Sequence, residues 1–146
     1  TAMGLSPGVL YTAIRQLEPE RVLAITSAEA RPHVAEACSQ AHWDAERVSV
    51  YVVPDAHACF AEVEQILVWA SPLLLDAREV VVNLTGGTTA MQYLVERVAG
   101  QASRFGVPVE RYALLDRRSP DAQRRDPYGA GEVVPLRGDE GSAGRE

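Results

Sequence analysis

The residues of this chain best suited to binding chemistry lie in one short run, 80–91, where apolar residues, two glycines and several hydroxyl side chains follow one another. Val80–Val82 are consecutive β-branched residues, which is typical of a strand buried on both faces. Gly86 and Gly87 let the backbone turn sharply and approach a ligand without a Cβ in the way. Apolar residues at positions 91, 94, 95 and 98 then have the spacing of an amphipathic helix. A strand, a tight turn and a helix N-terminus together suit a phosphate or another anion.

The alternative for this run is an ordinary strand-to-helix turn that uses glycines only for tightness. Asn83 and the threonines at 85, 88 and 89 favour the ligand-binding interpretation, because they add amide and hydroxyl groups around the glycines. The run is not a P-loop, since the lysine that should follow the glycines is missing. The sequence also has no G-x-G-x-x-G pattern, which argues against a standard dinucleotide site.

A second candidate is Gly4-Leu5-Ser6-Pro7-Gly8, which matches the G-x-S-x-G pattern of a hydrolase nucleophile elbow. A hydrolase is excluded because the residue after Ser6 is Pro7, which has no backbone N–H for an oxyanion hole. Ser6 is expected instead to be the N-cap of a helix with Pro7 at its first position, its hydroxyl facing the carboxyl edge of the sheet. A capping role alone is the alternative for Ser6.

A third candidate is Asp116-Arg117-Arg118, directly after a predicted strand, for which a solvated turn is the alternative. All three candidates follow strands, so in a parallel sheet they lie on the same edge. Ligands of open α/β sheets bind in the crevice at that edge. This convergence strengthens the prediction of a binding site there.

Composition narrows the function further. The chain has 146 residues and a net charge of −6, so a single domain is expected and duplex nucleic acid is excluded as a partner. Every cationic side chain is arginine. Cys38 and Cys59 lack CxxC spacing, and the histidines at 33, 42 and 57 lack ligand spacing, so no metal and no cofactor are expected. We see no signal segment, and no apolar run is long enough to span a bilayer, which predicts a cytoplasmic protein.

Apolar periodicity predicts alternating strands and helices. We expect helices over 7–17, 32–41, 60–70 (ending or kinking at Pro72) and 88–104, and strands over 21–26, 48–53, 79–84, 107–115 and 132–136. Residues 117–131 are expected to be a long loop. The fold class is therefore α/β, a Rossmann-like, mostly parallel sheet with helices on both faces. Its first strand is short or truncated, and we expect residues to have been lost before Thr1. The domain spans 1–137, and 138–146 is expected to be a flexible polar tail.

These motifs resemble those of CARF domains, the CRISPR-associated Rossmann-fold sensors. Residues 83–91, Asn-Leu-Thr-Gly-Gly-Thr-Thr-Ala-Met, are similar to the family motif D-x-T-G-G-T-K-x-M. Residues 4–9 resemble the family's Gly-x-Ser-Pro turn, 21–27 its second strand, and Asp116-Arg117 the turn after its fifth strand. The likeness extends from Thr1 to about Leu136.

The resemblance implies a homodimer that binds a cyclic oligoadenylate second messenger across its two-fold axis, in type III CRISPR antiviral defence. Cyclic tetra-adenylate is favoured over hexa-adenylate. Such a sensor controls an effector segment that is absent from this chain, and contact with a membrane would come only through a transmembrane helix preceding residue 1. The ligand-binding residues implied are Leu5, Ser6, Pro7, Gly8, Thr26, Ser27, Asn83, Thr85, Gly86, Gly87, Thr88, Thr89, Met91, Asp116 and Arg117.

Two departures from the family pattern bear on activity. Asn83 stands where the family often has Asp, and Thr89 stands where it often has Lys. The missing lysine removes a phosphate contact, so we expect binding with slow cleavage or none, and no catalytic residue is assigned. Two alternatives stay open: a ring nuclease that cleaves the messenger, and a generic nucleotide-binding α/β domain.

Overall fold

Strands and helices alternate along the chain in the computed structural model, which describes residues 1–137. The strands are β1 (Ala2–Met3), β2 (Val22–Ser27), β3 (Val48–Val53), β4 (Val80–Asn83), β5 (Val109–Leu115) and β6 (Glu132–Pro135). The helices are α1 (Gly8–Leu17), α2 (Arg31–Gln40), α3 (Val63–Leu75), α4 (Thr89–Arg104) and α5 (Pro120–Arg125), with 3-10 turns η1 (Ala45–Arg47) and η2 (Cys59–Glu62).

The strands form two three-stranded sheets, β1-β2-β3 and β4-β5-β6. All pairs are parallel except β5–β6, which is antiparallel. The two sheets meet at β1 and β4, because the Asn83 side-chain amide donates a hydrogen bond to the Thr1 hydroxyl at 3.0 Å. Continuing across this contact gives the strand order β3-β2-β1-β4-β5-β6, in which the order reverses between β1 and β4. Such a reversal is where ligands bind in doubly wound folds.

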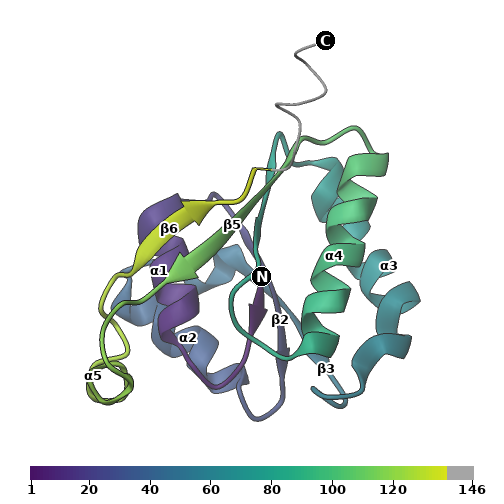
Figure 1. Ribbon diagram of the computed structural model, residues 1–146. Coiled ribbons are helices and arrows are strands. Elements are labelled where there is room, and N and C mark those ends of the chain that lie inside the picture. The colour runs from purple at the N-terminus through teal and green to yellow at the C-terminus, as the bar shows by residue number, and fades with distance from the viewer. Residues whose placement is uncertain (138–146) are drawn as a thin grey trace.

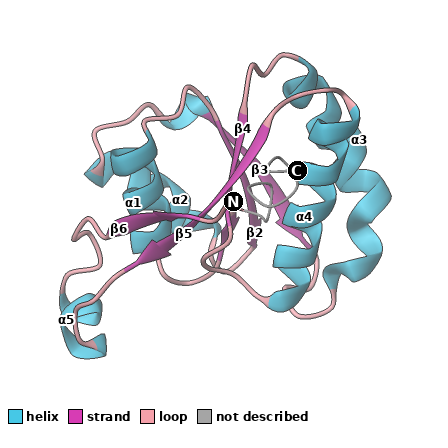
Figure 2. Ribbon diagram, turned by 45° about the horizontal axis from the view of Figure 1, so that its top comes forward, coloured by secondary structure: helices cyan, strands magenta, loops and turns pink. Residues whose placement is uncertain are grey.

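Helices cover both faces of the strands, with α1 and α2 on one side and α3 and α4 on the other (Figures 1 and 2). Side chains alternate along β2, so this strand contributes to the hydrophobic cores on both faces of the sheet. Leu23 and Ile25 pack in the larger core with α3 and α4. Val22 and Ala24 pack in the smaller core with α1 and α2. The mixed α/β, mostly parallel fold expected from the sequence is therefore confirmed, including its short first strand.

Two expected boundaries are wrong. The third helix does not end at Pro72, because α3 continues to Leu75. Proline lacks the N–H that would donate to the carbonyl oxygen of Val68. Because Val68 is 76% exposed, water can hydrogen-bond to that carbonyl instead. The expected loop 117–131 contains the short helix α5, which Ser119 caps by accepting a hydrogen bond from the Ala122 N–H.

The first helix also begins differently from the expectation. Pro7, not Ser6, occupies the N-cap position of α1, and no side chain caps the helix. Proline at that position leaves the Ser6 hydroxyl outside the helix, on an exposed residue.

Within residues 1–137, no helix has both the length and the apolar character to cross a membrane. The tail expected at 138–146 lies outside the described residues.

Candidate functional site

The loop between β4 and α4 has a backbone shape that requires glycine. Gly86 and Gly87 have φ angles of +98° and +72°, in the region that side-chain-bearing residues avoid. A Cβ on Gly87 would lie 2.7 Å from the Cβ of Ala2, and one on Gly86 would lie 3.3 Å from the Ala2 carbonyl oxygen. The loop is therefore pressed against β1, at the point where the strand order reverses.

The polar side chains of this loop hold it in place. Asn83 is 3% exposed and accepts a hydrogen bond from the Thr85 N–H at 2.9 Å. The Thr85 hydroxyl accepts from the Leu114 N–H at 2.8 Å, which ties the loop to β5. The Thr88 hydroxyl caps α4 by accepting from the Met91 N–H, and it donates to the carbonyl oxygen of Ala56. These side chains are thus already hydrogen-bonded within the protein itself.

The backbone of the same loop keeps its donors free. None of the N–H groups of residues 86–90 donates a hydrogen bond to another atom within residues 1–137. They occupy the last part of the loop and the first turn of α4, where the helix dipole adds positive potential. Consecutive free N–H groups at a helix N-terminus form an anion-binding site.

The loop after β1 lies beside this site. A Cβ on Gly4 would be 3.6 Å from the backbone nitrogen of Gly87, so the two loops are in contact. Leu5 is 59% exposed and Ser6 is also exposed. The Ser6 hydroxyl makes no hydrogen bond to any described residue and can be offered to a ligand. Pro7 is buried, and a Cβ on Gly8 would collide with the carbonyl oxygen of Pro127.

Several residues of the expected ligand set lie beneath the loops. Thr26 is fully buried and its hydroxyl donates to the Met3 carbonyl oxygen at 2.8 Å, which fastens β1 to β2. The Ser27 hydroxyl accepts from the Ala30 N–H at 3.2 Å. Met91 is 1% exposed and packs in the larger core. The side chains of Thr26 and Met91 therefore support the loops from below and are closed to a ligand. Thr89 is exposed at the first position of α4.

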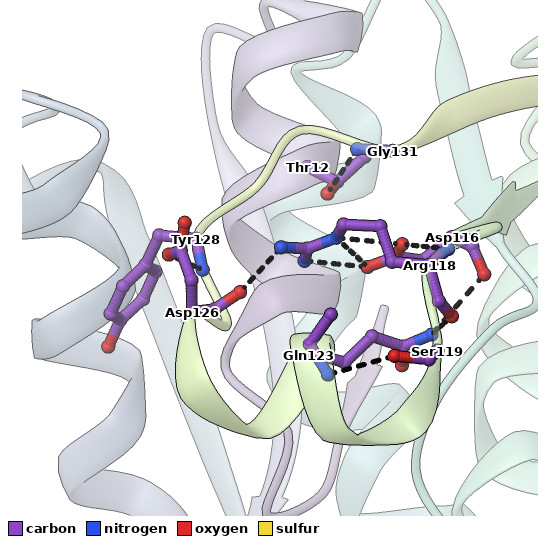
Figure 3. A network of polar contacts seen from close by, with 9 residues as sticks. Thr12, Asp116, Arg118, Ser119, Gln123, Asp126, Tyr128 and Gly131 are labelled. Carbon is purple, nitrogen blue, oxygen red and sulfur yellow. Dashed lines mark hydrogen bonds and ion pairs between the residues drawn. The ribbon is translucent and has the colours of Figure 1, made fainter.

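In the third expected group, Asp116 pairs with the neighbouring Arg118 in a network of polar contacts around α5 (Figure 3). The Asp116 carboxylate accepts from the Arg118 guanidinium at 2.8 Å, and this hydrogen bond holds the pKa of Asp116 below its usual range. Arg118 also donates to the Asp126 carbonyl oxygen at 2.8 Å and so links the two ends of the α5 segment. Arg117 is 71% exposed and pairs with Glu132 at 3.0 Å. The charged groups after β5 stabilise the α5 segment.

The sequence analysis did not predict that the loop after β3 lies next to this site. Its Ala56 carbonyl oxygen accepts from the Thr88 hydroxyl, so this loop touches the cap of α4. Next to Ala56 stands His57, which is exposed. The signal was available, because β3 is parallel to β2 and therefore ends at the same edge.

An exposed aromatic pair is also near this border. Phe60 in η2 is 48% exposed and Tyr93, one turn into α4, is 40% exposed. Their ring centroids are 5.6 Å apart with the rings tilted by 54°. Aromatic faces that remain in water can stack on a nucleobase. Tyr93 follows Thr89 by four residues, so helical spacing predicts that both lie on the same face of α4.

Among the described residues, no group of three or more His, Cys, Asp or Glu side chains is arranged to hold a metal ion. Cys38 and Cys59 are buried, and burial raises the pKa of both thiols, so neither is a ready nucleophile. A scan of the chain against protein-family models found no match, and a search of curated proteins found none either.

Proposed function

We propose that the chain is a sensor domain that binds a cyclic oligoadenylate at the edge formed by residues 4–7 and 84–90. The observation that carries this proposal is the row of backbone N–H groups at residues 86–90, which have no partner within the described chain. Donors of this kind recognise phosphate oxygens without any lysine. Because the chain has no lysine and a net charge of −6, we expect these backbone donors to provide most of the attraction for phosphate.

Features beside the N–H groups favour an adenylate over inorganic phosphate. The exposed rings of Phe60 and Tyr93 offer stacking surface for a base. The hydroxyls of Ser6 and Thr89 lie on exposed residues of the two loops and can pair with ribose or phosphate. The resemblance to the CARF motif supplies the cyclic form of the ligand and the role in antiviral defence.

The proposed assembly is a homodimer with one ring on its two-fold axis. A cyclic tetra-adenylate has the same symmetry as an isologous interface, so each copy contacts half of the ring. The side chain of Leu5, 59% exposed next to the site, is suited to contact with the second copy. The signal then passes to an effector segment outside this chain.

Titration calorimetry with cyclic tri-, tetra- and hexa-adenylate tests this proposal, with AMP and ATP as competitors of the same chemistry. The expected result is tightest binding of cyclic tetra-adenylate, at one ring per two chains. Tighter binding of AMP or ATP than of any ring would contradict the proposal and favour a generic nucleotide-binding domain.

One observation supports the ring nuclease as a second candidate. The Ala56 contact brings the exposed His57 to the border of the site, and histidine is the commonest general acid or base. We nonetheless expect slow cleavage or none, because losing one preorganised donor costs about 10²–10³ in rate and the family's lysine is missing. A single-turnover assay with labelled cyclic tetra-adenylate checks this. Rapid cleavage that is abolished in His57→Ala would establish the enzyme in place of the sensor.

A further inference from the structure

The amide side chain of Gln92 reaches back from α4 to the glycine loop of the proposed ligand site. Gln92 lies one turn into α4, and the side chains of a helix lean toward its N-terminus. Its Nε2 group donates a hydrogen bond to the carbonyl oxygen of Gly86 at 2.5 Å. Among residues 1–137, no other group donates to that oxygen. The Gln92 side chain is therefore the contact that holds this carbonyl group.

The direction of the Gly86 carbonyl fixes the direction of the next N–H. The peptide bond between Gly86 and Gly87 is trans and planar, so its C=O and N–H groups point in opposite directions. Because the carbonyl points toward the Gln92 amide, the Gly87 N–H points away from it. This N–H has no acceptor within residues 1–137, and it is therefore available to a ligand.

The backbone alone does not fix the orientation of this peptide. A flip of the peptide changes ψ of Gly86 and φ of Gly87 by about 180° each and exchanges the places of the C=O and the N–H. Gly87 has a φ of +72°, and glycine adopts negative φ about as readily as positive φ. Since glycines flank the peptide on both sides, an interaction from outside the loop has to select one orientation.

The second polar atom of the Gln92 side chain shows that packing does not explain this residue. The Gln92 Oε1 atom is buried and has no hydrogen-bond partner within residues 1–137. A buried acceptor without a partner destabilises a fold, and an apolar side chain of similar shape avoids that penalty. Packing alone would favour methionine here. What glutamine adds is the Nε2 donor on the Gly86 carbonyl.

We propose that Gln92 is a positioning residue of the ligand site, whose Nε2 donor selects the peptide orientation in which the Gly87 N–H is free to bind a phosphate oxygen. In the opposite orientation, the Gly86 carbonyl oxygen would take the place of that N–H and repel an anion. The identity of the ligand rests on the proposed function, whereas the orientation of the peptide is measured without any ligand.

The first test is Gln92→Met, which keeps the length of the side chain and removes both polar atoms. We expect cyclic tetra-adenylate to bind about 10-fold more weakly, because the peptide is no longer held in one orientation. The melting temperature should stay within about 2 °C, since removal of the unpaired Oε1 offsets the lost hydrogen bond. Gln101→Met is the matched control, because Gln101 also lies in α4 but donates to the Ser71 hydroxyl at 3.5 Å. It should leave the affinity unchanged.

The second test is Gln92→Glu, which replaces the donor by a carboxylate that only accepts hydrogen bonds. The carboxylate repels the Gly86 carbonyl oxygen and attracts the Gly87 N–H, so we expect the peptide to flip. Hydrogen exchange of the Gly87 amide, measured by NMR on the ligand-free protein, reports this flip. Exchange should be fast in the unchanged protein and in Gln92→Met, and at least ~10-fold slower in Gln92→Glu.

Unchanged affinity in a folded Gln92→Met protein would overturn the inference. Exchange of the Gly87 amide in Gln92→Glu at the rate of the unchanged protein would also overturn it. An equal loss of affinity in Gln92→Met and Gln101→Met would assign the effect to the helix as a whole and contradict a role in positioning. If the unchanged protein binds no adenylate, the proposed function fails, and the exchange measurement still decides whether Gln92 sets the orientation of the peptide.

Discussion

The loops after β4 and after β5 end neighbouring strands of one sheet, yet they use their polar groups in opposite ways. The loop after β5 is rich in charge, and its Asp116 and Arg118 satisfy one another and the ends of the α5 segment. The loop after β4 has no ionisable side chain between Asn83 and Met91, and its backbone donors at residues 86–90 have no partner within residues 1–137. In the described structure, the charged groups of the loop after β5 are paired with one another, whereas the backbone donors of the loop after β4 are not paired.

The difference shows that charge in a sequence is a weak guide to a binding site. Arginine and aspartate two residues apart can pair within their own loop and leave nothing for a partner. Glycine cannot do this, because it has no side chain to satisfy the N–H groups around it. Backbone donors at a turn with positive φ therefore remain available unless another part of the chain covers them.

The largest effect on this contrast should come from Gly87→Val. A β-branched residue is strained at φ +72°, and its Cβ would lie 2.7 Å from that of Ala2, so the N–H groups would move away from the ligand. We expect cyclic tetra-adenylate to bind at least about 30-fold more weakly, or ~2 kcal/mol, the scale of a lost charge-assisted hydrogen bond. Calorimetry measures the affinity, and circular dichroism checks the fold.

Gly100→Ala is the matched control, since Gly100 lies within α4 and a Cβ added to it would meet no atom within 4 Å. It should leave affinity unchanged and raise stability by about 0.5–1 kcal/mol, because alanine is the better helix former. A folded Gly87→Val protein with normal affinity would place the ligand elsewhere.

A smaller and more selective effect is expected from Thr89→Pro, which deletes one backbone N–H at a position that accepts proline. Thr89 is the first residue of α4, where proline is favoured, and Thr88 has the extended backbone that precedes proline readily. Loss of a single N–H to a phosphate should weaken binding about 10-fold, or ~1.5 kcal/mol. The measurement is the same titration.

Thr89→Ala separates the N–H from the hydroxyl at this position. It keeps the N–H and removes only the hydroxyl, so its loss should be about threefold or less. An equal loss in the alanine and proline variants would assign the contact to the hydroxyl and contradict the role given to the backbone.

Much of the fold could be predicted because its signals are local. The β-branched run at 80–82 and the helical spacing after Met91 depend only on neighbouring residues, and a strand and a helix form there. The expected burial of that strand on both faces is wrong, because Val81 is 40% exposed. The helix α5 was missed although Ser119-Pro120 is a standard helix start, because the surrounding Arg, Asp and Gly residues suggested a loop. Pro72 was overvalued because the cost of a helical proline depends on whether water reaches the freed carbonyl.

The site was predicted less completely than the fold. Gly86 and Gly87 were identified because the residue type itself indicates positive φ. The sequence could not show that the hydroxyls of Thr85 and Thr88 are hydrogen-bonded to Leu114 and Ala56, because these partners are about thirty positions away. His57 was not predicted to lie near the site for the same reason, because it is also about thirty positions away from Thr88. Side-chain partnerships across a sheet edge are fixed by tertiary packing, which residue types alone do not encode.

The smallest effect should come from Asp116→Asn, which tests the loop after β5. Asparagine keeps the shape but removes the charge that Arg118 binds, so the α5 segment should loosen and the melting temperature should fall slightly. Affinity for cyclic tetra-adenylate should stay within about twofold, since no ligand contact is lost. Arg117→Ala, which removes only an exposed pair with Glu132, is the control and should change neither quantity. A tenfold or greater loss of affinity in Asp116→Asn would mean that the loop after β5 reaches the ligand, and the contrast between the two loops would fail.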